Sequence, residues 1–308
     1  ENSRLESLIR GLQEAALKSL NKKGPMPMED HTIRDQLDAL QDQIRCWTRK
    51  YSVPALADLD QISEPSKTGI LDSLEGFCAT TYWSSLVESL ATWKDRIPAL
   101  LLQALIAKDI LAPMFRDPFF VWDGFSERSD MSGAMKMKNL YDTMEQAVDK
   151  AEAHAWRSHM LRILSTDARP GMDRLSVEAR NRENMLISMF LESEGFVHLL
   201  RPTNNVNEID GRYKELEALY QNASDLALSL WKMGTDMNYV DQSDTPKFDI
   251  SNTMMSAHRL HKLDENDHRL DGMNVLLCVQ PAIVAYGSEN EEPYDQPKVW
   301  ARSVMLID

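Results

Sequence analysis

The sequence predicts a mainly α fold, a multi-helix bundle of about seven helices with a small C-terminal β hairpin. Apolar residues recur at steps of three and four along most of the chain before Thr245, the spacing of amphipathic helices. Short segments rich in Pro and Gly separate these stretches and are typical of turns. After Thr245-Pro246 the pattern changes to two short β-like runs, so we expect helices first and strands last.

We expect one domain overall, in three parts. Residues 1–24 form an N-terminal helix with Leu5, Leu8, Leu12 and Ala15 at heptad spacing. Two interpretations stay open: a first helix packed on the domain, or the end of an upstream coiled coil that allows self-association. Residues 25–245 form the bundle, and residues 246–308 form a polar loop and the hairpin packed on it. Because the chain begins at Glu1 in helical phase, we expect an excised segment of a larger protein.

In the first half of the bundle, the sequence predicts three helices. The first spans 29–51, with one apolar stripe, and ends before Val53-Pro54, since the residue before proline leaves helical geometry. After a polar connection, a second spans 71–93. A third spans 99–114, with Pro98 in its first turn, and is apolar on nearly all sides. That composition predicts a central helix surrounded by others.

Three long helices are predicted next, over 133–165, 173–200 and 207–237. Short turns separate them, which favours antiparallel packing. In the first of them we place the inward face on the apolar stripe, formed by Met144, Val148, Ala151, Ala155, His159 and Ile163.

Only the C-terminal segment reads as β. Residues 273–286 and 299–307 are the two runs, and the acidic loop 288–297 separates them. Pro281 makes the first run an edge strand or splits it in two, since proline cannot donate to a sheet. A lone hairpin is marginal in water, so we expect it to lie on the helices or to pair with a partner strand.

Composition limits the classes of function. The formal net charge is −14 with a pI near 5.0, so the overall field repels phosphate backbones and direct nucleic-acid binding is disfavoured. Three widely separated cysteines fit reduced thiols, which predicts an intracellular protein, cytoplasmic or nuclear. We expect no membrane association, because the most apolar run is interrupted by Gln103, Lys108 and Asp109 and reads as a buried helix.

His258, His261 and Asp264 are the candidate metal ligands. Imidazole and carboxylate groups suit zinc or a similar divalent ion, and steps of three residues would place them in one sector of a helix. The segment matches neither HExxH nor a calcium-binding loop. A solvated polar loop that leads into the first strand is therefore the alternative.

Signatures of other chemistry are absent from the sequence. It has neither a GxSxG nucleophile elbow nor a glycine-rich phosphate loop. His154 and His159 lie on one predicted helix, where a core histidine is the favoured interpretation over a general base. We therefore expect no cofactor, and an enzyme is the less favoured class.

Four segments carry a family resemblance: DQIRCWTRKY, LLLQALIAKDILAPMFRDPFF, AHAWRSHMLRIL and LDGMNVLLCVQPAIVAYGSENEEPYDQPKVW. Together they resemble a helical domain that recurs in uncharacterised proteins of filamentous fungi, the ascomycetes. The resemblance covers nearly the whole chain. It implies one C-terminal unit preceded by disordered or coiled regions, and it implies no activity.

The function predicted from the sequence is that of a non-enzymatic protein-interaction or assembly domain in a larger intracellular, regulatory protein. Its expected partner surface is the hairpin, with residues Pro281, Tyr286, Glu291, Glu292 and Tyr294. The alternative is a metal-dependent helical enzyme that uses His258, His261 and Asp264.

Overall fold

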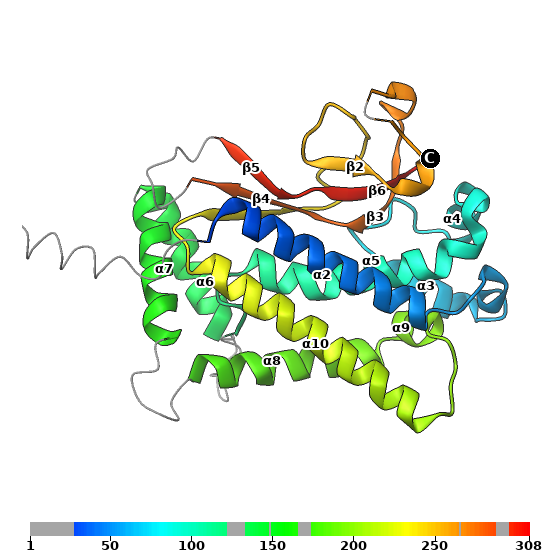
Figure 1. The fold of residues 1–308 in the computed structure, drawn as a ribbon, viewed down its shortest axis with the longest axis horizontal. Helices are drawn as coiled ribbons and strands as arrows, with labels where there is room; N and C mark the ends of the chain where they lie inside the picture. Colours follow the sequence, from blue (N-terminus) through cyan, green and yellow to red (C-terminus); the bar gives the residue numbers. More distant parts are fainter. Residues whose placement is uncertain (1–27, 122–132, 148, 166–173, 265, 288–295) are drawn as a thin grey trace, which may run out of the picture.

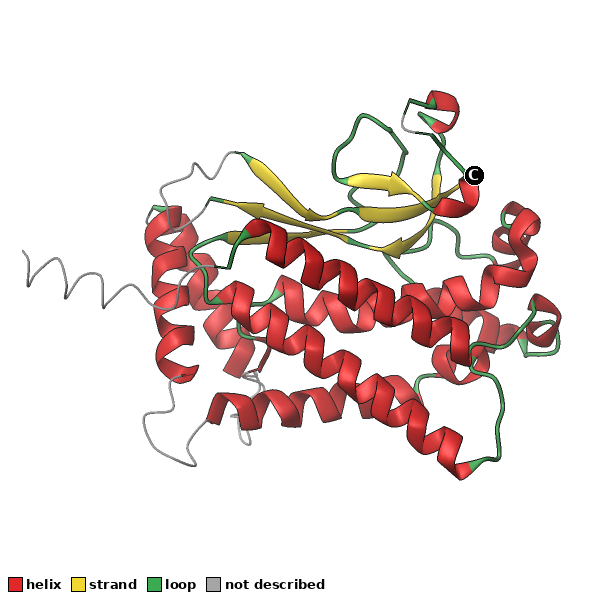
Figure 2. Cartoon of the chain, viewed as in Figure 1, coloured by secondary structure: helices red, strands yellow, loops and turns green. Residues whose placement is uncertain are grey.

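The computed structural model describes residues 28–121, 133–147, 149–165, 174–264, 266–287 and 296–308. The N-terminal helix predicted for residues 1–24 and most of the acidic loop, including Glu291, Glu292 and Tyr294, lie outside this range. Two small sheets cover one side of a helical layer (Figures 1 and 2). The fold is thus mainly α with a C-terminal β portion, as predicted, but that portion exceeds a hairpin.

Three helices form the central layer: α2 (Asp30–Tyr51), α5 (Ile97–Arg116) and α10 (Val206–Trp231). They pack against one another, and α8 (Arg174–Glu192) lies on α10 on the side away from the sheets (Figure 1). The expected stripe of α2 is buried, as are most residues of α5 on all sides. The prediction of a central helix that starts at Pro98 is therefore confirmed.

The helix predicted over 71–93 was wrong. The chain instead forms α3 (Glu64–Ser73), α4 (Trp83–Ser89) and the 3₁₀ helix η2 (Ala91–Arg96). Between α3 and α4, Gly76 adopts φ +80°, a left-handed conformation that favours glycine. The next residues run along the edge of strand β3. Cys78 forms a β-bridge with Leu277, and the carbonyl of Phe77 accepts the N–H of Cys278 at 2.7 Å. Sheet pairing therefore displaces the helix here.

The remaining long helices are also interrupted. The predicted helix 133–165 is two helices, α6 (Gly133–Ala147) and α7 (Lys150–Ser165), and the predicted helix 173–200 is α8 followed by α9 (Glu194–Leu199). A short 3₁₀ helix, η1 (Leu56–Leu59), precedes α3.

The inward face of α7 is the opposite of the one predicted. Ala151, Ala155, His159 and Ile163 are exposed, whereas Ala153, His154, Arg157, Ser158 and Leu161 are buried. Hydrogen bonds explain the reversal. Arg157 donates to the carbonyls of Trp231, Met233 and Thr235, and Ser158 and Arg162 donate to that of Lys232. These carbonyls lie at the last residue of α10 and just after it, where they have no partner within the helix.

Within the described residues, six strands form two sheets of three. In one, β4 (Ala282–Tyr286) lies between β1 (Asp236–Val240) and β5 (Pro297–Ala301); in the other, β6 (Ser303–Ile307) lies between β2 (Met255–Ala257) and β3 (Val275–Gln280). All pairs are antiparallel except β2 with β6. Two further 3₁₀ helices, η4 (Arg259–His261) and η5 (His268–Leu270), lie between β2 and β3.

The predicted hairpin contributes two neighbouring strands to each sheet. Its two arms are β3 with β4 and β5 with β6, and each arm passes from one sheet to the other, at Pro281 and at Arg302. Pro281 thus splits the first run in two. The strand β1 was missed, because the helix predicted over 207–237 ends at Trp231 and the chain has turned into the sheet by Asp236.

Among the residues that the structure describes, one helical stretch, Ala91–Arg116, is long and apolar enough to cross a membrane by length and composition alone. Of its most apolar window, 72% is buried inside the fold. Such burial is what the core helix of a bundle shows, and it agrees with the interpretation made from the sequence.

Candidate anion-binding pocket

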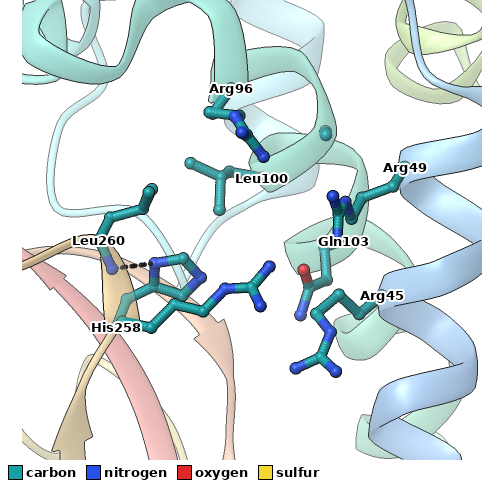
Figure 3. A pocket seen from close by; sticks show the side chains of 9 residues that line it. Arg45, Arg49, Arg96, Leu100, Gln103, His258 and Leu260 are labelled. Carbon is teal, nitrogen blue, oxygen red and sulfur yellow. Dashed lines mark hydrogen bonds between the residues drawn. The ribbon is translucent and has the colours of Figure 1, made fainter.

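A pocket of about 350 Å³ lies where α2, the start of α5 and η4 meet. Figure 3 shows Arg45 and Arg49 on α2, Arg96 just before α5, and His258 across the pocket from them. The remaining lining residues are Ala99, Leu100, Gln103, Arg259 and Leu260. Four guanidinium groups therefore line one small cavity, and no carboxylate is among its lining residues.

The local sequence explains how these arginines come together. Arg45 and Arg49 are four residues apart on α2, so they lie on one face of the helix, one turn apart. Arg96 occupies the N-cap position of α5, and Arg259 begins η4. The buried Trp47 and Leu100 fix α2 and α5 in the core, which holds the basic side chains at the rim.

The positive charge of the pocket is only partly neutralised by the protein. Arg45 pairs with Asp42, with 2.7 Å between Nη2 and Oδ1. Within the described part of the chain, the side chains of Arg49, Arg96 and Arg259 make no ion pair or side-chain hydrogen bond. A cluster of unpaired guanidinium groups attracts an anion, because arginine presents a rigid set of donors to phosphate or carboxylate.

His258 contributes a neutral donor to the pocket. Its Nδ1 accepts the N–H of Leu260 at 3.3 Å, so in the neutral ring the proton is on Nε2. Burial, and the charges of Arg259, His261 and Arg45, lower the pKa of His258 to about 4. The ring therefore stays neutral at physiological pH, and its Nε2–H can donate to a bound anion.

Two further features suit a partly apolar, anionic ligand. Ala99 and Leu100 belong to the first turn of α5, whose N-terminal end carries a partial positive charge. Leu100 and Gln103 are buried, so the floor of the pocket is rigid. Gln103 adds an amide to the lining of the pocket (Figure 3).

Of the three predicted metal ligands, His258 lines this pocket, and His261 and Asp264 do not. His258 and His261 each direct one ring nitrogen to a backbone N–H, those of Leu260 and Ile307, and Asp264 is exposed. Among the described residues, the three ligand atoms that come within 4.8 Å of one another belong to Glu145, His154 and Asp236. The fold does not bring His258, His261 and Asp264 into such a group, so metal binding there stays a prediction.

The predicted partner surface is partly placed. Pro281 is buried at the bend between β3 and β4, and Tyr286 is half-buried at the end of β4, where its backbone pairs with Asp236 and Pro297. Because β4 is a central strand, it offers no free edge. A partner at the hairpin stays a prediction.

The arginine pocket was missed in the sequence because its members come from distant segments. The one local signal was the pair Arg45 and Arg49, within the segment used for the family resemblance. Comparisons with protein-family models, with curated proteins and with solved structures found no match. Fold and site together define a helical domain, backed by two small sheets, with an arginine-lined pocket.

Proposed function

We propose that this chain is a non-enzymatic interaction domain that binds a phosphate group carried by a protein partner, and that the arginine pocket is its recognition site. The observation that supports this most directly is the set of four arginines around one cavity, three of them without a protein partner in the described part of the chain. The proposal keeps the class predicted from the sequence and assigns it a site.

Phosphate fits the pocket better than a single carboxylate does. A phosphorylated side chain carries about −1.5 to −2 charges at neutral pH and three acceptor oxygens. Four guanidinium groups, the Gln103 amide and the His258 Nε2–H supply more donors than one carboxylate can accept. Arginine clusters are a recurrent way in which proteins read phosphorylated motifs.

A protein partner is favoured over a nucleic acid by charge. The pocket is a small basic region on a chain of net charge −14. A nucleic acid presents a long row of phosphates, which such a chain repels outside the pocket. A single phosphate on a peptide needs only the pocket itself.

The test is a ³¹P NMR titration with three probes: the tripeptide Ac-Ala-pSer-Ala-NH₂, its unphosphorylated form, and inorganic phosphate. We expect saturable, one-to-one binding of the phosphotripeptide, followed by its phosphorus shift, and no binding of the unphosphorylated form in a ¹H titration. Arg49→Gln and Arg96→Gln should each weaken binding by about tenfold or more, because a hydrogen bond to a charged group contributes ~1.5–3 kcal/mol.

Arg302→Gln is the matched control, since Arg302 is exposed and does not line the pocket. It should bind the phosphotripeptide as the unmodified chain does. Equal losses in Arg302→Gln and in the pocket variants would reduce the effect to net charge and overturn the proposed site. Tighter binding of inorganic phosphate than of the phosphotripeptide would overturn the protein partner in favour of a free phosphate.

A further inference from the structure

A second polar cluster lies at the junction of α6, α7 and β1. Glu145 comes from the end of α6, His154 from the second turn of α7, and Asp236 is the first residue of β1. One ligand atom from each lies within 4.8 Å of the other two, and Nδ1 of His154 is 3.7 Å from Oε1 of Glu145. Three elements distant in sequence thus converge on one point.

We propose that Glu145, His154 and Asp236 form a binding site for one divalent transition-metal ion, Zn²⁺ or Mn²⁺. An imidazole with two carboxylates is a ligand set that suits these ions. This site is separate from the arginine pocket and does not depend on the function proposed for that pocket.

The charges around the three residues support a cation there. Within the described chain, neither carboxylate is within ion-pair distance of a lysine or arginine, and Glu145 Oε1 lies 3.7 Å from Nδ1 of His154. Two acidic side chains therefore converge on one imidazole, and a divalent ion would supply positive charge at this point.

Arg157 lies beside this cluster but forms its hydrogen bonds with other groups. Arg157 is fully buried and donates to the carbonyls of Trp231, Met233 and Thr235 and to the hydroxyl of Tyr141. These bonds leave its guanidinium aimed at the end of α10 rather than at either carboxylate. It acts as the scaffold of the cluster, and it fixes α7 and the start of β1 relative to each other.

Tyr141 determines how the imidazole can be released to a metal. Its hydroxyl is 2.5 Å from Nδ1 of His154 and accepts a hydrogen bond from Arg157. When a metal occupies Nδ1, the hydroxyl can turn its proton toward the Glu145 carboxylate while Arg157 continues to donate to its oxygen. This would make Tyr141 an outer partner that orients a ligand, as is common around metal ions.

The site is also accessible. His154 is completely buried, but the side chain of Glu145 is 27% exposed and Asp236 is half-buried. An ion can therefore reach the carboxylates from solvent and meet the imidazole at the inner end of the site.

The test uses metal-free chain prepared with a chelator, then titrated with ZnCl₂ by calorimetry and with MnCl₂ by electron paramagnetic resonance, in which bound Mn²⁺ loses the signal of the free ion. We expect one ion per chain for at least one of the two metals. Glu145→Gln and Asp236→Asn keep the side-chain shape and should weaken binding by about tenfold to a hundredfold, the range seen for changes around metal sites.

Asp142→Asn is the matched control, because Asp142 lies on the same helix but pairs with Lys138 at 2.5 Å. It should leave binding unchanged, as should His261→Gln in the predicted C-terminal site. Circular dichroism establishes that each variant is folded. The proposal is overturned if neither metal binds one-to-one, or if folded Glu145→Gln and Asp236→Asn bind as tightly as the unmodified chain.

Discussion

Nε2 of His261 accepts the backbone N–H of Ile307 at 3.1 Å, so this side chain joins η4 to strand β6. The ring also lies edge-on to Trp93, with 4.7 Å between the ring centroids. His261 therefore holds the C-terminal strand against the end of the helical layer.

This relationship predicts a loss of stability in His261→Ala. The change leaves the N–H of Ile307 without its acceptor and removes the aromatic contact, which together should lower the free energy of unfolding by about 2 kcal/mol. Urea unfolding followed by circular dichroism measures it. His31→Ala, at a side chain that is 69% exposed, should change little; a similar loss in both variants would contradict the assigned role.

Arg157→Lys should destabilise the chain more strongly. Lysine cannot reach the same carbonyls of the α10–β1 connection with a planar set of donors, and buried acceptors lose their partners. We expect a loss of about 3 kcal/mol or more in the free energy of unfolding. Arg302→Lys, at an exposed arginine, is the control in the same urea experiment and should lie within about 0.5 kcal/mol of the unmodified chain.

The pair of Asp109 and Tyr220 predicts a pH dependence. Burial raises the pKa of Asp109 to about 6, and the Tyr220 hydroxyl donates to its carboxylate. Since the unfolded pKa is 3.8, the folded chain binds more protons between these two values. Stability from this group is therefore present at low pH and lost as pH rises through about 6.

Asp109→Asn removes that titration and keeps an acceptor for Tyr220. Relative to the unmodified chain, the variant should gain about 2 to 3 kcal/mol in unfolding free energy between pH 4 and pH 7. Denaturant unfolding at several pH values gives the difference. If the difference is the same at every pH, Asp109 has an ordinary pKa and the prediction is wrong.

The three cysteines should react in a fixed order. Cys46 is exposed, Cys78 is half-buried and Cys278 is buried, and burial raises the pKa of both Cys78 and Cys278. Because the thiolate is the reactive form, a thiol reagent should label Cys46 in the folded chain and all three cysteines in denaturant. Mass spectrometry of digested protein identifies the sites, and Cys46→Ser should abolish rapid labelling.

The helices with a single clean stripe were predictable from sequence, and those with polar inward faces were not. In α2 and α5 the buried residues are apolar apart from Thr48 and Gln103, so the apolar pattern located both. In α7 the buried face carries Arg157, which donates to backbone carbonyls, and His154, which belongs to the cluster with Glu145 and Asp236. A prediction based on hydrophobicity therefore takes the exposed face of α7 for the inward one.

Among the strands, too, only buried apolar runs were predictable from the sequence, and neither candidate site was. The first arm of the hairpin could be predicted because β3 and β4 are buried apolar runs. Strand β1 was missed because the predicted helix over 207–237 extended into its first residues. Neither Arg96 with Arg259 nor Glu145 with Asp236 is close in sequence. Only the packing of α5 on α2 and of α7 on the end of α10 brings such residues together, and periodicity carries no information about it.

The position of β6 has a consequence for the order in which this fold assembles during synthesis. β6 comes last of the described elements, yet it is the central strand of its sheet, and the nearby Trp300 donates to Asp30 at the start of α2. The ribosome releases every helix before it releases this strand. Until β6 emerges, the apolar sides of α2 and α5 that face the sheets stay uncovered. A chaperone would bind this nascent intermediate.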